Sequence, residues 1–172
     1  FAAALDNLSH SDNGFVLQVE GGRVDHAGHA NDPAAILHEY LDFDACIPVA
    51  LEYIKSHPET MLIVTTDHGT GGCQLNGHGN SYNDSGPALD RINQIKYSFE
   101  WLQNRFKATG QFNPAPVQMA FGIESSEEQS KIVQAALDNK DEYLSGALTK
   151  AFGKKLKEMT AVGWTSSKHT SE

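Results

Sequence analysis

The sequence is poor in cysteine, in positive charge and in long apolar runs, and each shortage excludes a class of protein. Its two cysteines, Cys46 and Cys73, are too few for a disulfide-rich framework or a four-cysteine zinc site. Acidic residues outnumber basic ones by 22 to 13, and the resulting net charge of −9 disfavours nucleic acid and anionic membranes as partners. The longest apolar runs, such as Met61 to Val64, are far shorter than the ~20 residues of a membrane-spanning helix.

The first residues lack the features of a secretion signal, because they have neither a basic start nor a long apolar stretch. They also lack an initiating methionine, so we expect the chain to be part of a longer protein. With 172 residues, 40% of them hydrophobic, the chain is nevertheless long enough to form one folded domain with its own core.

The first half of the chain has the pattern of a strand, a helix and a second strand. β-forming residues from Gly14 to Glu20 and from Thr60 to Thr66 predict two buried strands. The helix between them is expected to start at Asn31 or Asp32 and to be kinked or split by Pro48. This βαβ order predicts a parallel sheet covered by helices, with functional sites at the carboxyl ends of its strands.

The second half is predicted to be a helical region behind a long polar loop. Residues 69 to 87 are rich in Gly, Asn and Ser and predict the loop. Apolar spacing predicts helices from Ala88 to Phe106 and from Glu142 to Glu158. Between them, Ser125 and Glu128 have the spacing of a capping box at the start of a third helix.

Carboxylates and imidazoles gather where the two predicted strands end. Asp25 and His29 are four residues apart, so on a helical turn they would share one face. Asp67 and His68 are adjacent, and they can converge only if the strand ends there and the chain turns at Gly69. Together with Glu20 at the end of the first strand, these residues would lie at one edge of the sheet.

Each of these residues also has a structural interpretation. Glu20 can form a salt bridge with Arg23, and Asp25 can be the capping acid of a surface helix. Asp67 and His68 can form a capped strand end with a solvated imidazole. The remaining histidines of the helices and the long loop have no partner at ligand spacing, and we interpret them as structural or solvated: His38, His57 and His78.

The combination favours metal binding over these separate interpretations. Oxygen and nitrogen donors without a thiolate suit zinc and magnesium. Several such donors at one sheet edge indicate more than one metal ion. Two metal ions about 4 Å apart are a recurring arrangement for clamping the attacking and leaving oxygens in phosphoryl transfer.

Three blocks of sequence resemble the alkaline phosphatases. They are "VEGGRVDHAGH" from Val19 to His29, "VTTDHG" from Val64 to Gly69, and "HT" at His169 and Thr170. The resemblance implies an α/β fold, a three-layer α/β/α sandwich with a largely parallel sheet, of which this chain holds a part together with a helical insertion. It divides the chain into a core portion with the metal-binding strand ends (1–86), a helical insertion (87–160) and a return segment (161–172).

The resemblance also implies two zinc ions, one magnesium ion and a role for each donor. Glu20 corresponds to the magnesium ligand. One zinc would be bound by Asp25 and His29, completed by His169 from the return segment, and the second zinc by Asp67 and His68. His26 directly follows a ligand, and the resemblance implies a place for it near the phosphate or the magnesium site, as a substrate contact or a residue behind the ligands.

The implied activity is hydrolysis of small phosphate monoesters through a phosphoserine intermediate. The serine nucleophile of the family belongs to a segment upstream of these blocks, so none is expected in this chain, and Ser11 has the wrong context. The resemblance further implies a periplasmic or secreted protein and a homodimer. Two alternatives remain: a phosphodiesterase, sulfatase or mutase of the same superfamily, and a non-catalytic metal-binding module.

Overall fold

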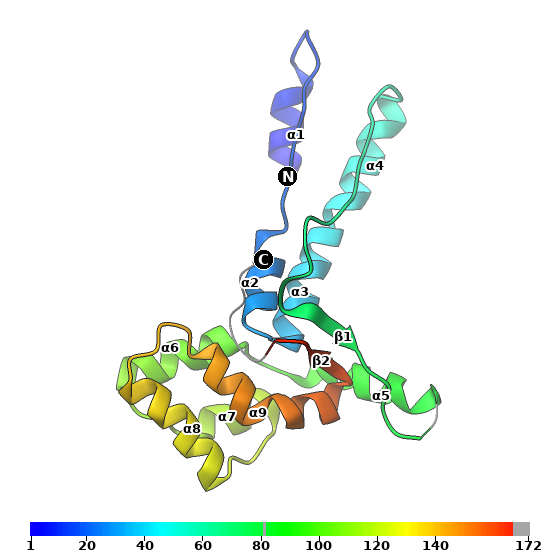
Figure 1. Cartoon of the computed structure of the whole chain (residues 1–172). Helices are drawn as coiled ribbons and strands as arrows, with labels where there is room; N and C mark the ends of the chain where they lie inside the picture. The colour runs from blue at the N-terminus through cyan, green and yellow to red at the C-terminus, as the bar shows by residue number, and fades with distance from the viewer. Residues whose placement is uncertain (81, 167–172) are drawn as a thin grey trace.

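The computed structural model describes residues 1–80 and 82–166, and these are mostly helical (Figure 1). Within these ranges no helix is both long and apolar enough to span a membrane. The helices are α1 (Ala2–Ser9), α2 (Gly22–His29), α3 (Pro33–Asp44), α4 (Cys46–Ser56), α5 (Ser85–Asp90), α6 (Phe99–Thr109), α7 (Pro114–Phe121), α8 (Glu127–Asp138) and α9 (Ser145–Thr160). Short 3-10 helices are η1 (Thr70–Gly72), η2 (Tyr82–Asp84) and η3 (Arg91–Gln94), and the strands are β1 (Cys73–Leu75) and β2 (Val162–Trp164).

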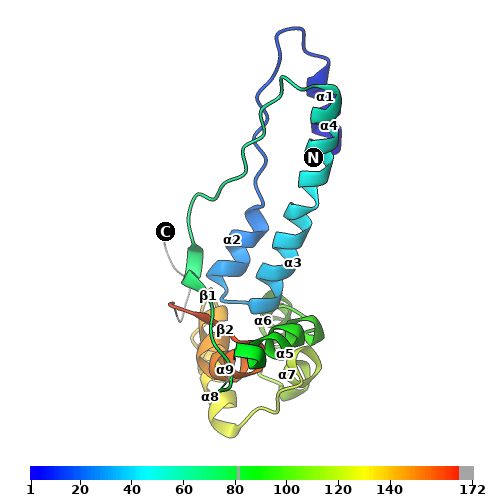
Figure 2. The same cartoon turned by 90° about the vertical axis from the view of Figure 1, so that its right-hand side faces the viewer.

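Among the described residues the sheet has two antiparallel strands, β1 and β2, with Gln74 opposite Gly163. The two predicted strands, Gly14–Glu20 and Thr60–Thr66, are extended, but the described residues supply no strand that pairs with them. Figure 2 shows both segments running in the same direction, one toward α2 and the other toward β1. Val16 is 96% exposed and Ile63 is 69% exposed, so the prediction of buried strands is wrong for this structure.

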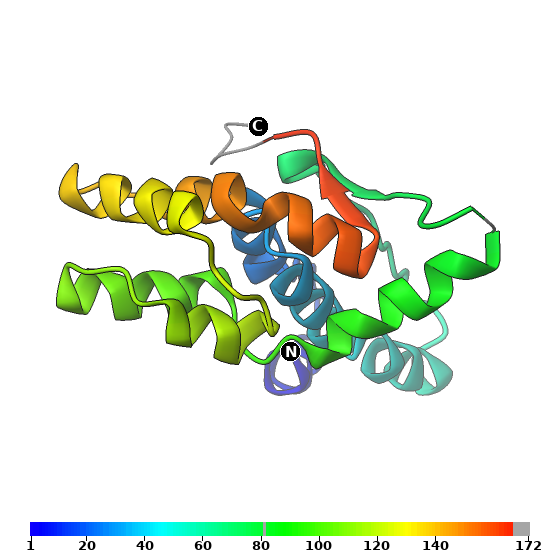
Figure 3. The same ribbon diagram turned by 90° about the horizontal axis from the view of Figure 1, so that it is seen from below.

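The hydrophobic core lies in the helical body, a name used here for α5 to α9 with their connections (Figures 1 and 3). In Figure 3 the yellow α8 and the orange α9 run along each other on one side of this body. Its largest fully buried apolar side chains are Phe99, Phe106, Phe152, Leu102, Leu144, Leu148, Val117 and Val133. By contrast, the buried apolar side chains within 1–80 are Leu5, Ala27, Pro33, Ala34 and Ala50, which enclose little apolar volume.

The start and the break of the first long helix agree with the sequence. Asp32 caps α3 and Pro33 occupies its first turn, where a missing N–H costs nothing. The helix ends at Asp44 and a new one begins at Cys46. The predicted split at Pro48 is therefore confirmed. Its physical reason is that Pro48 has no N–H to donate to the carbonyl of Asp44.

Two predictions in the helical body are wrong in detail. The single helix from Ala88 to Phe106 is interrupted, because α5 passes into η3 and a non-helical stretch precedes Ser98, whose hydroxyl caps α6. The capping box before α8 consists of Ser126 and Gln129 rather than Ser125 and Glu128. The sequence "SSEEQ" contains the capping pattern twice, one residue apart, so spacing alone does not choose between them.

Asp32 joins the first part of the chain to the helical body. Its side chain is 1% exposed, and one carboxylate oxygen accepts hydrogen bonds from the N–H groups of Ala34 and Ala35 at 3.1 and 2.9 Å. The other oxygen accepts a hydrogen bond of 2.6 Å from the N–H of Phe99, the first residue of α6. Burial raises the pKa of Asp32, and its three backbone donors only partly offset that rise.

Replacing Asp32 by alanine in the protein that carries this chain is expected to lower the free energy of unfolding by about 3 kcal/mol. The variant loses the cap of α3 and leaves the buried N–H of Phe99 without an acceptor. Asn113→Ala is the matched control, since Asn113 caps only α7 and should cost about 1 kcal/mol. If urea unfolding shows the same loss of free energy of unfolding for Asp32→Ala and Asn113→Ala, the hydrogen bond from Phe99 to Asp32 contributes nothing.

The raised pKa of Asp32 makes its contribution depend on pH. The folded protein keeps this proton at pH values where the unfolded chain has lost it, so the contribution is fully present below the ordinary pKa of 3.8. It is lost as the pH rises through the folded pKa. The difference in stability between wild type and Asp32→Asn should therefore be larger at about pH 4 than at about pH 7 in thermal unfolding. A difference that grows with pH would contradict this assignment.

Candidate metal centre

The first donor pair lies on α2. Asp25 and His29 share one face of this helix, with His29 Nε2 3.4 Å from Asp25 Oδ2. Two ligand atoms bound to one tetrahedral zinc at about 2.0–2.1 Å are about 3.4 Å from each other. The separation of this pair therefore fits two ligands of one cation, and the helical spacing predicted from the sequence is confirmed.

The second donor pair follows the extended segment that ends near Thr66. His68 Nε2 lies 3.5 Å from Asp67 Oδ2, a separation that again fits two ligands of one cation. The backbone N–H of His68 donates to Asp67 Oδ1 at 3.0 Å, which holds the carboxylate. These adjacent side chains converge because the chain leaves its extended conformation here and enters η1 through Gly69.

Thr70 connects the two pairs. Its hydroxyl donates to Asp25 Oδ1 at 2.7 Å and lies 2.7 Å from His68 Nδ1. Since the hydroxyl proton goes to Asp25, the same oxygen accepts the N–H of His68 Nδ1, which leaves Nε2 of that ring with its lone pair free for a metal. Sequence reasoning missed Thr70, although a hydroxyl residue two positions after a candidate ligand is a signal for such a contact.

Glu20 and Arg23 do not form the salt bridge that the sequence allowed. Glu20 is exposed at the end of its extended segment, just before Gly21, the residue that precedes α2. Arg23 instead pairs with Glu100 of α6 and, at 3.8 Å, with Glu39 of α3. The carboxylate of Glu20 thus remains at the end of this segment, just before α2, where a metal ligand was predicted.

His26 faces the helical body rather than the first donor pair. Its Nδ1 accepts a hydrogen bond of 3.2 Å from Arg23. Together with Arg23, Ser98 and Glu100 it lines a small cavity of about 70 Å³ between α2 and the start of α6. A metal-binding role for His26 itself is therefore not favoured, and its predicted contact with substrate or with the ligands stays a prediction.

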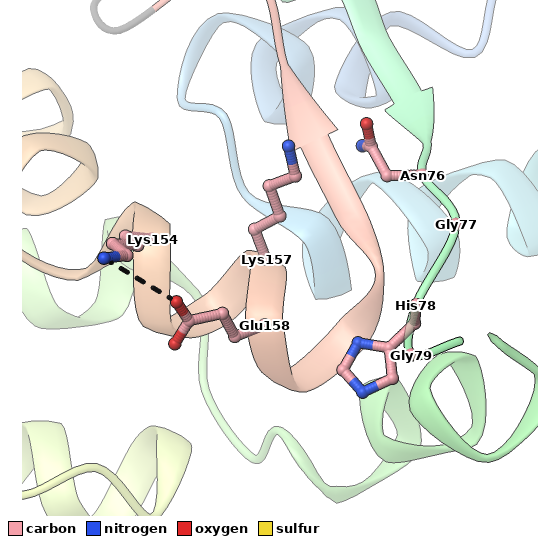
Figure 4. A pocket seen from close by; sticks show the side chains of 7 residues that line it. All are labelled: Asn76, Gly77, His78, Gly79, Lys154, Lys157 and Glu158. Atoms are coloured by element: carbon pink, nitrogen blue, oxygen red, sulfur yellow. Dashed lines mark ion pairs between the residues drawn. The ribbon is translucent and has the colours of Figure 1, made fainter. Parts of the chain in front are cut away.

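Two further histidines of the described residues, His57 and His78, lie away from both pairs. His57 stacks on Tyr53 with ring centroids 4.0 Å apart, as expected of a structural residue. His78 lines a separate cavity of about 300 Å³ together with Lys157 and the ion pair of Lys154 and Glu158, 3.9 Å apart (Figure 4). None of the predicted metal ligands lines that cavity.

The described residues supply donor pairs rather than complete metal sites. Within 1–80 and 82–166 no three His, Cys, Asp or Glu side chains gather as a metal-holding group. A zinc site needs three or four ligands, so each pair requires further donors. His169, predicted to complete the first zinc site, lies outside the described residues. Both cysteines are free thiols and contribute to neither pair.

Comparison with known proteins gives the same assignment along the whole chain. The sequence model of the alkaline phosphatase family matches residues 1–172. Alkaline phosphatase 4 of Bacillus subtilis is 30% identical over 170 residues, which cover 99% of this chain and 35% of the relative. The chain thus spans about a third of the length of this relative.

Two solved structures are similar in fold over nearly the whole chain. The Thermus thermophilus alkaline phosphatase superposes with a TM-score of 0.76 at 29% identity, over 98% of this chain and 38% of that one. The cold-active alkaline phosphatase of a psychrophilic Shewanella gives a TM-score of 0.71 at 30% identity, over 99% of this chain and 41% of that one. With its family model matched from end to end, the chain belongs to the alkaline phosphatase family.

Proposed function

We propose that the protein carrying this chain hydrolyses phosphate monoesters with two zinc ions and one magnesium ion. The observation that carries the proposal is the geometry of the two Asp–His pairs. Each pair has the separation of two ligands of one cation, and Thr70 joins Asp25 of one to His68 of the other. A member of the alkaline phosphatase family with two linked cation sites is suited to phosphoryl transfer.

Each donor receives one role in this proposal. Asp25 and His29 bind one zinc, which His169 completes, and Asp67 and His68 bind the other. Glu20 binds magnesium, an ion that prefers carboxylate oxygen. When bound, such ions lower the pKa of a nucleophile and offset the negative charge that develops on the transferring phosphoryl group.

Metal ions would also supply the positive charge that this acidic chain needs in order to bind an anionic substrate. The chain carries a net charge of −9, and a phosphate monoester is an anion. The one basic side chain on α2 other than its histidines, Arg23, is engaged with Glu39 and Glu100. Binding a phosphate beside Asp25 and Asp67 therefore requires cations at this end of α2.

The proposal includes a parallel sheet that the rest of the protein completes. Two segments, Gly14–Glu20 and Thr60–Thr66, run in the same direction, are rich in β-forming residues and expose apolar side chains (Figure 2). The chain covers 38% to 41% of the solved family members, so most of the family fold lies outside it. That remainder supplies the neighbouring strands and the serine nucleophile.

The same proposal extends to substrates, assembly and location. Small phosphate monoesters are the substrates, and neither nucleic acid nor a membrane is a partner, in keeping with the acidic surface. We further propose a homodimer and a periplasmic or secreted location, both of which rest on the resemblance to the family.

Replacing His29 by alanine in the complete protein should remove a zinc ligand. We expect kcat/KM for p-nitrophenyl phosphate to fall by at least about 100-fold, together with the zinc content measured by atomic absorption. His57→Ala is the matched control and should change neither quantity more than about twofold, since the ring of His57 contacts its neighbours at the end of α4, where it stacks on Tyr53 and lies within hydrogen-bonding distance of Ser56 Oγ and the Tyr53 carbonyl.

Two outcomes would overturn the proposed function. Faster turnover of bis(p-nitrophenyl) phosphate than of the monoester by the wild type would favour a phosphodiesterase of the superfamily. A His29→Ala variant with lower melting temperature but unchanged turnover would favour a metal-binding module without catalysis.

Replacing Ile63 by aspartate tests the proposed sheet. In the complete protein the new carboxylate would be buried without a partner, so the free energy of unfolding should fall by about 3 kcal/mol or more. Met119→Asp, at an exposed position of α7, is the control and should cost less than about 1 kcal/mol. If both variants of the complete protein unfold at the urea concentration of the wild type, the segment around Ile63 is not an inner strand.

A further inference from the structure

The larger of the two cavities described above lies between the loop that follows β1 and the last turns of α9 (Figure 4). The loop contributes residues 76–79 to its lining, and α9 contributes Lys154, Lys157 and Glu158. Its volume of about 300 Å³ is at the lower end of the range for sites that bind small molecules. None of the predicted metal ligands that the structure describes lines it, so this cavity is separate from the candidate metal centre.

The lining of this cavity is positively charged, although the chain as a whole is acidic. Lys154 Nζ lies 3.9 Å from Glu158 Oε1, and the charges of this ion pair offset each other. Lys157 forms no ion pair with a carboxylate in the part of the chain that the structure describes. Its charge therefore remains as an excess of positive charge in a chain whose net charge is −9, and such a lining favours an anion as ligand.

The direction of the Lys157 side chain is not explained by its place on the helix. Lys157 lies in the last turn of α9, where a positive charge interacts favourably with the helix dipole. However, a Cβ built on Gly163 would lie 3.3 Å from Lys157 Cδ, so the stem of the lysine passes over the bare backbone of β2. Figure 4 shows the side chain extending alongside β2. Its ammonium group is thus carried away from the end of its own helix.

The side chain of Asn76 approaches the same glycine from the loop after β1. A Cβ built on Gly163 would lie only 2.5 Å from Asn76 Nδ2, so a side chain at position 163 would displace this amide. Asn76 Nδ2 donates to the carbonyl of Gln74 at 3.0 Å, which uses one of its two hydrogens. Gly163 therefore lets a lysine side chain and an amide with a second N–H donor meet over one stretch of backbone.

The loop itself is fixed by hydrogen bonds at alternate residues. The N–H of Asn76 donates to Ala161 O at 2.7 Å, and that of His78 donates to the hydroxyl of the first residue of α5 at 3.1 Å. The N–H groups of Gly77 and Gly79 have no acceptor among the described residues. Backbone N–H groups of such loops are common partners of phosphate oxygens. The loop thus adds further donors to those of Asn76 and Lys157.

We propose that this cavity binds phosphate, either free or as the phosphate group of a small organic molecule, apart from the metal centre. Lysine binds phosphate as a point charge, and amide and backbone N–H groups donate to its oxygens. Lys157 supplies the charge, and Asn76 with the loop supplies the donors. The inference goes beyond the proposed function and does not depend on it, because it rests only on contacts of the loop, α9 and β2.

The experiment measures phosphate binding by the complete protein, in equilibrium dialysis against radiolabelled phosphate. We expect Lys157→Ala to weaken one class of phosphate sites at least about 10-fold, because it removes a charged partner. Lys157→Arg keeps the charge and should retain this class. Lys150→Ala is the matched control, because Lys150 is exposed on the same helix and does not line the cavity, and it should bind phosphate as the wild type does.

Turnover and folding are measured on the same variants. The kcat/KM of Lys157→Ala for p-nitrophenyl phosphate should equal that of the wild type, since Lys157 belongs to neither donor pair. Because Lys157 is exposed, Lys157→Ala and Lys150→Ala should also have the same melting temperature. Weaker phosphate binding by Lys157→Ala alone then reports the cavity and not a loss of structure.

Displacement by phenylphosphonate, a monoester analogue that cannot be hydrolysed, separates the two forms of the ligand. If phenylphosphonate binds the Lys157-dependent site more tightly than phosphate does, the ligand is a small phosphorylated molecule. If it binds more weakly, the ligand is free phosphate.

Identical phosphate binding by the wild type, Lys157→Ala and Lys150→Ala would overturn the proposal. Equal weakening by both alanine variants would also overturn it, because only Lys157 lines the cavity. A protein that hydrolyses no monoester but loses phosphate binding in Lys157→Ala would overturn the proposed function and leave the phosphate site standing.

Discussion

The carboxylate of Asp32 is the contact on which the arrangement of the two parts of the molecule depends. One of its oxygens fixes the start of α3, and the other holds the first N–H of α6. A carboxylate buried to this degree is tolerated only because backbone donors surround it, which also limits how the two helices can move apart. Since the main core belongs to the helical body, this junction gives α2, which carries the candidate ligands Asp25 and His29, a defined place beside that core.

The candidate metal centre is assembled by backbone contacts that only small residues permit. A Cβ on Gly28 would lie 2.9 Å from the carbonyl oxygen of Thr70, so α2 and the η1 turn meet without side chains between them. That approach lets the hydroxyl of Thr70 reach Asp25, which is 45 residues earlier in the chain. The histidines and carboxylates would supply the metal chemistry, but the glycines determine that donors from two segments become neighbours.

Local features of the sequence predicted local structure well. The cap at Asp32, the split near Pro48 and the shared face of Asp25 and His29 all depend on residues within one or two turns of each other.

Features that depend on distant partners were predicted poorly. Apolar spacing from Ala88 to Phe106 is compatible with one helix, yet Ser98 and the bond from Phe99 to Asp32 start a new one. The extended segment around Ile63 resembles a buried strand, but a strand is buried only by neighbours, which the described residues do not supply.

The sequence by itself determined the family, the pairs of candidate ligands and the caps of several helices, because these follow from residue type and short spacing. Only the tertiary structure decided that Arg23 pairs with the helical body instead of Glu20, that Thr70 links the two donor pairs, and that Asn31 donates a hydrogen bond to the carbonyl of Ser166. Except for the bond between Thr70 and His68, each of these contacts joins residues that are at least 45 positions apart in the sequence. Spacing along a chain carries no information about which distant atoms will lie within hydrogen-bonding distance, since packing of the whole fold sets those separations.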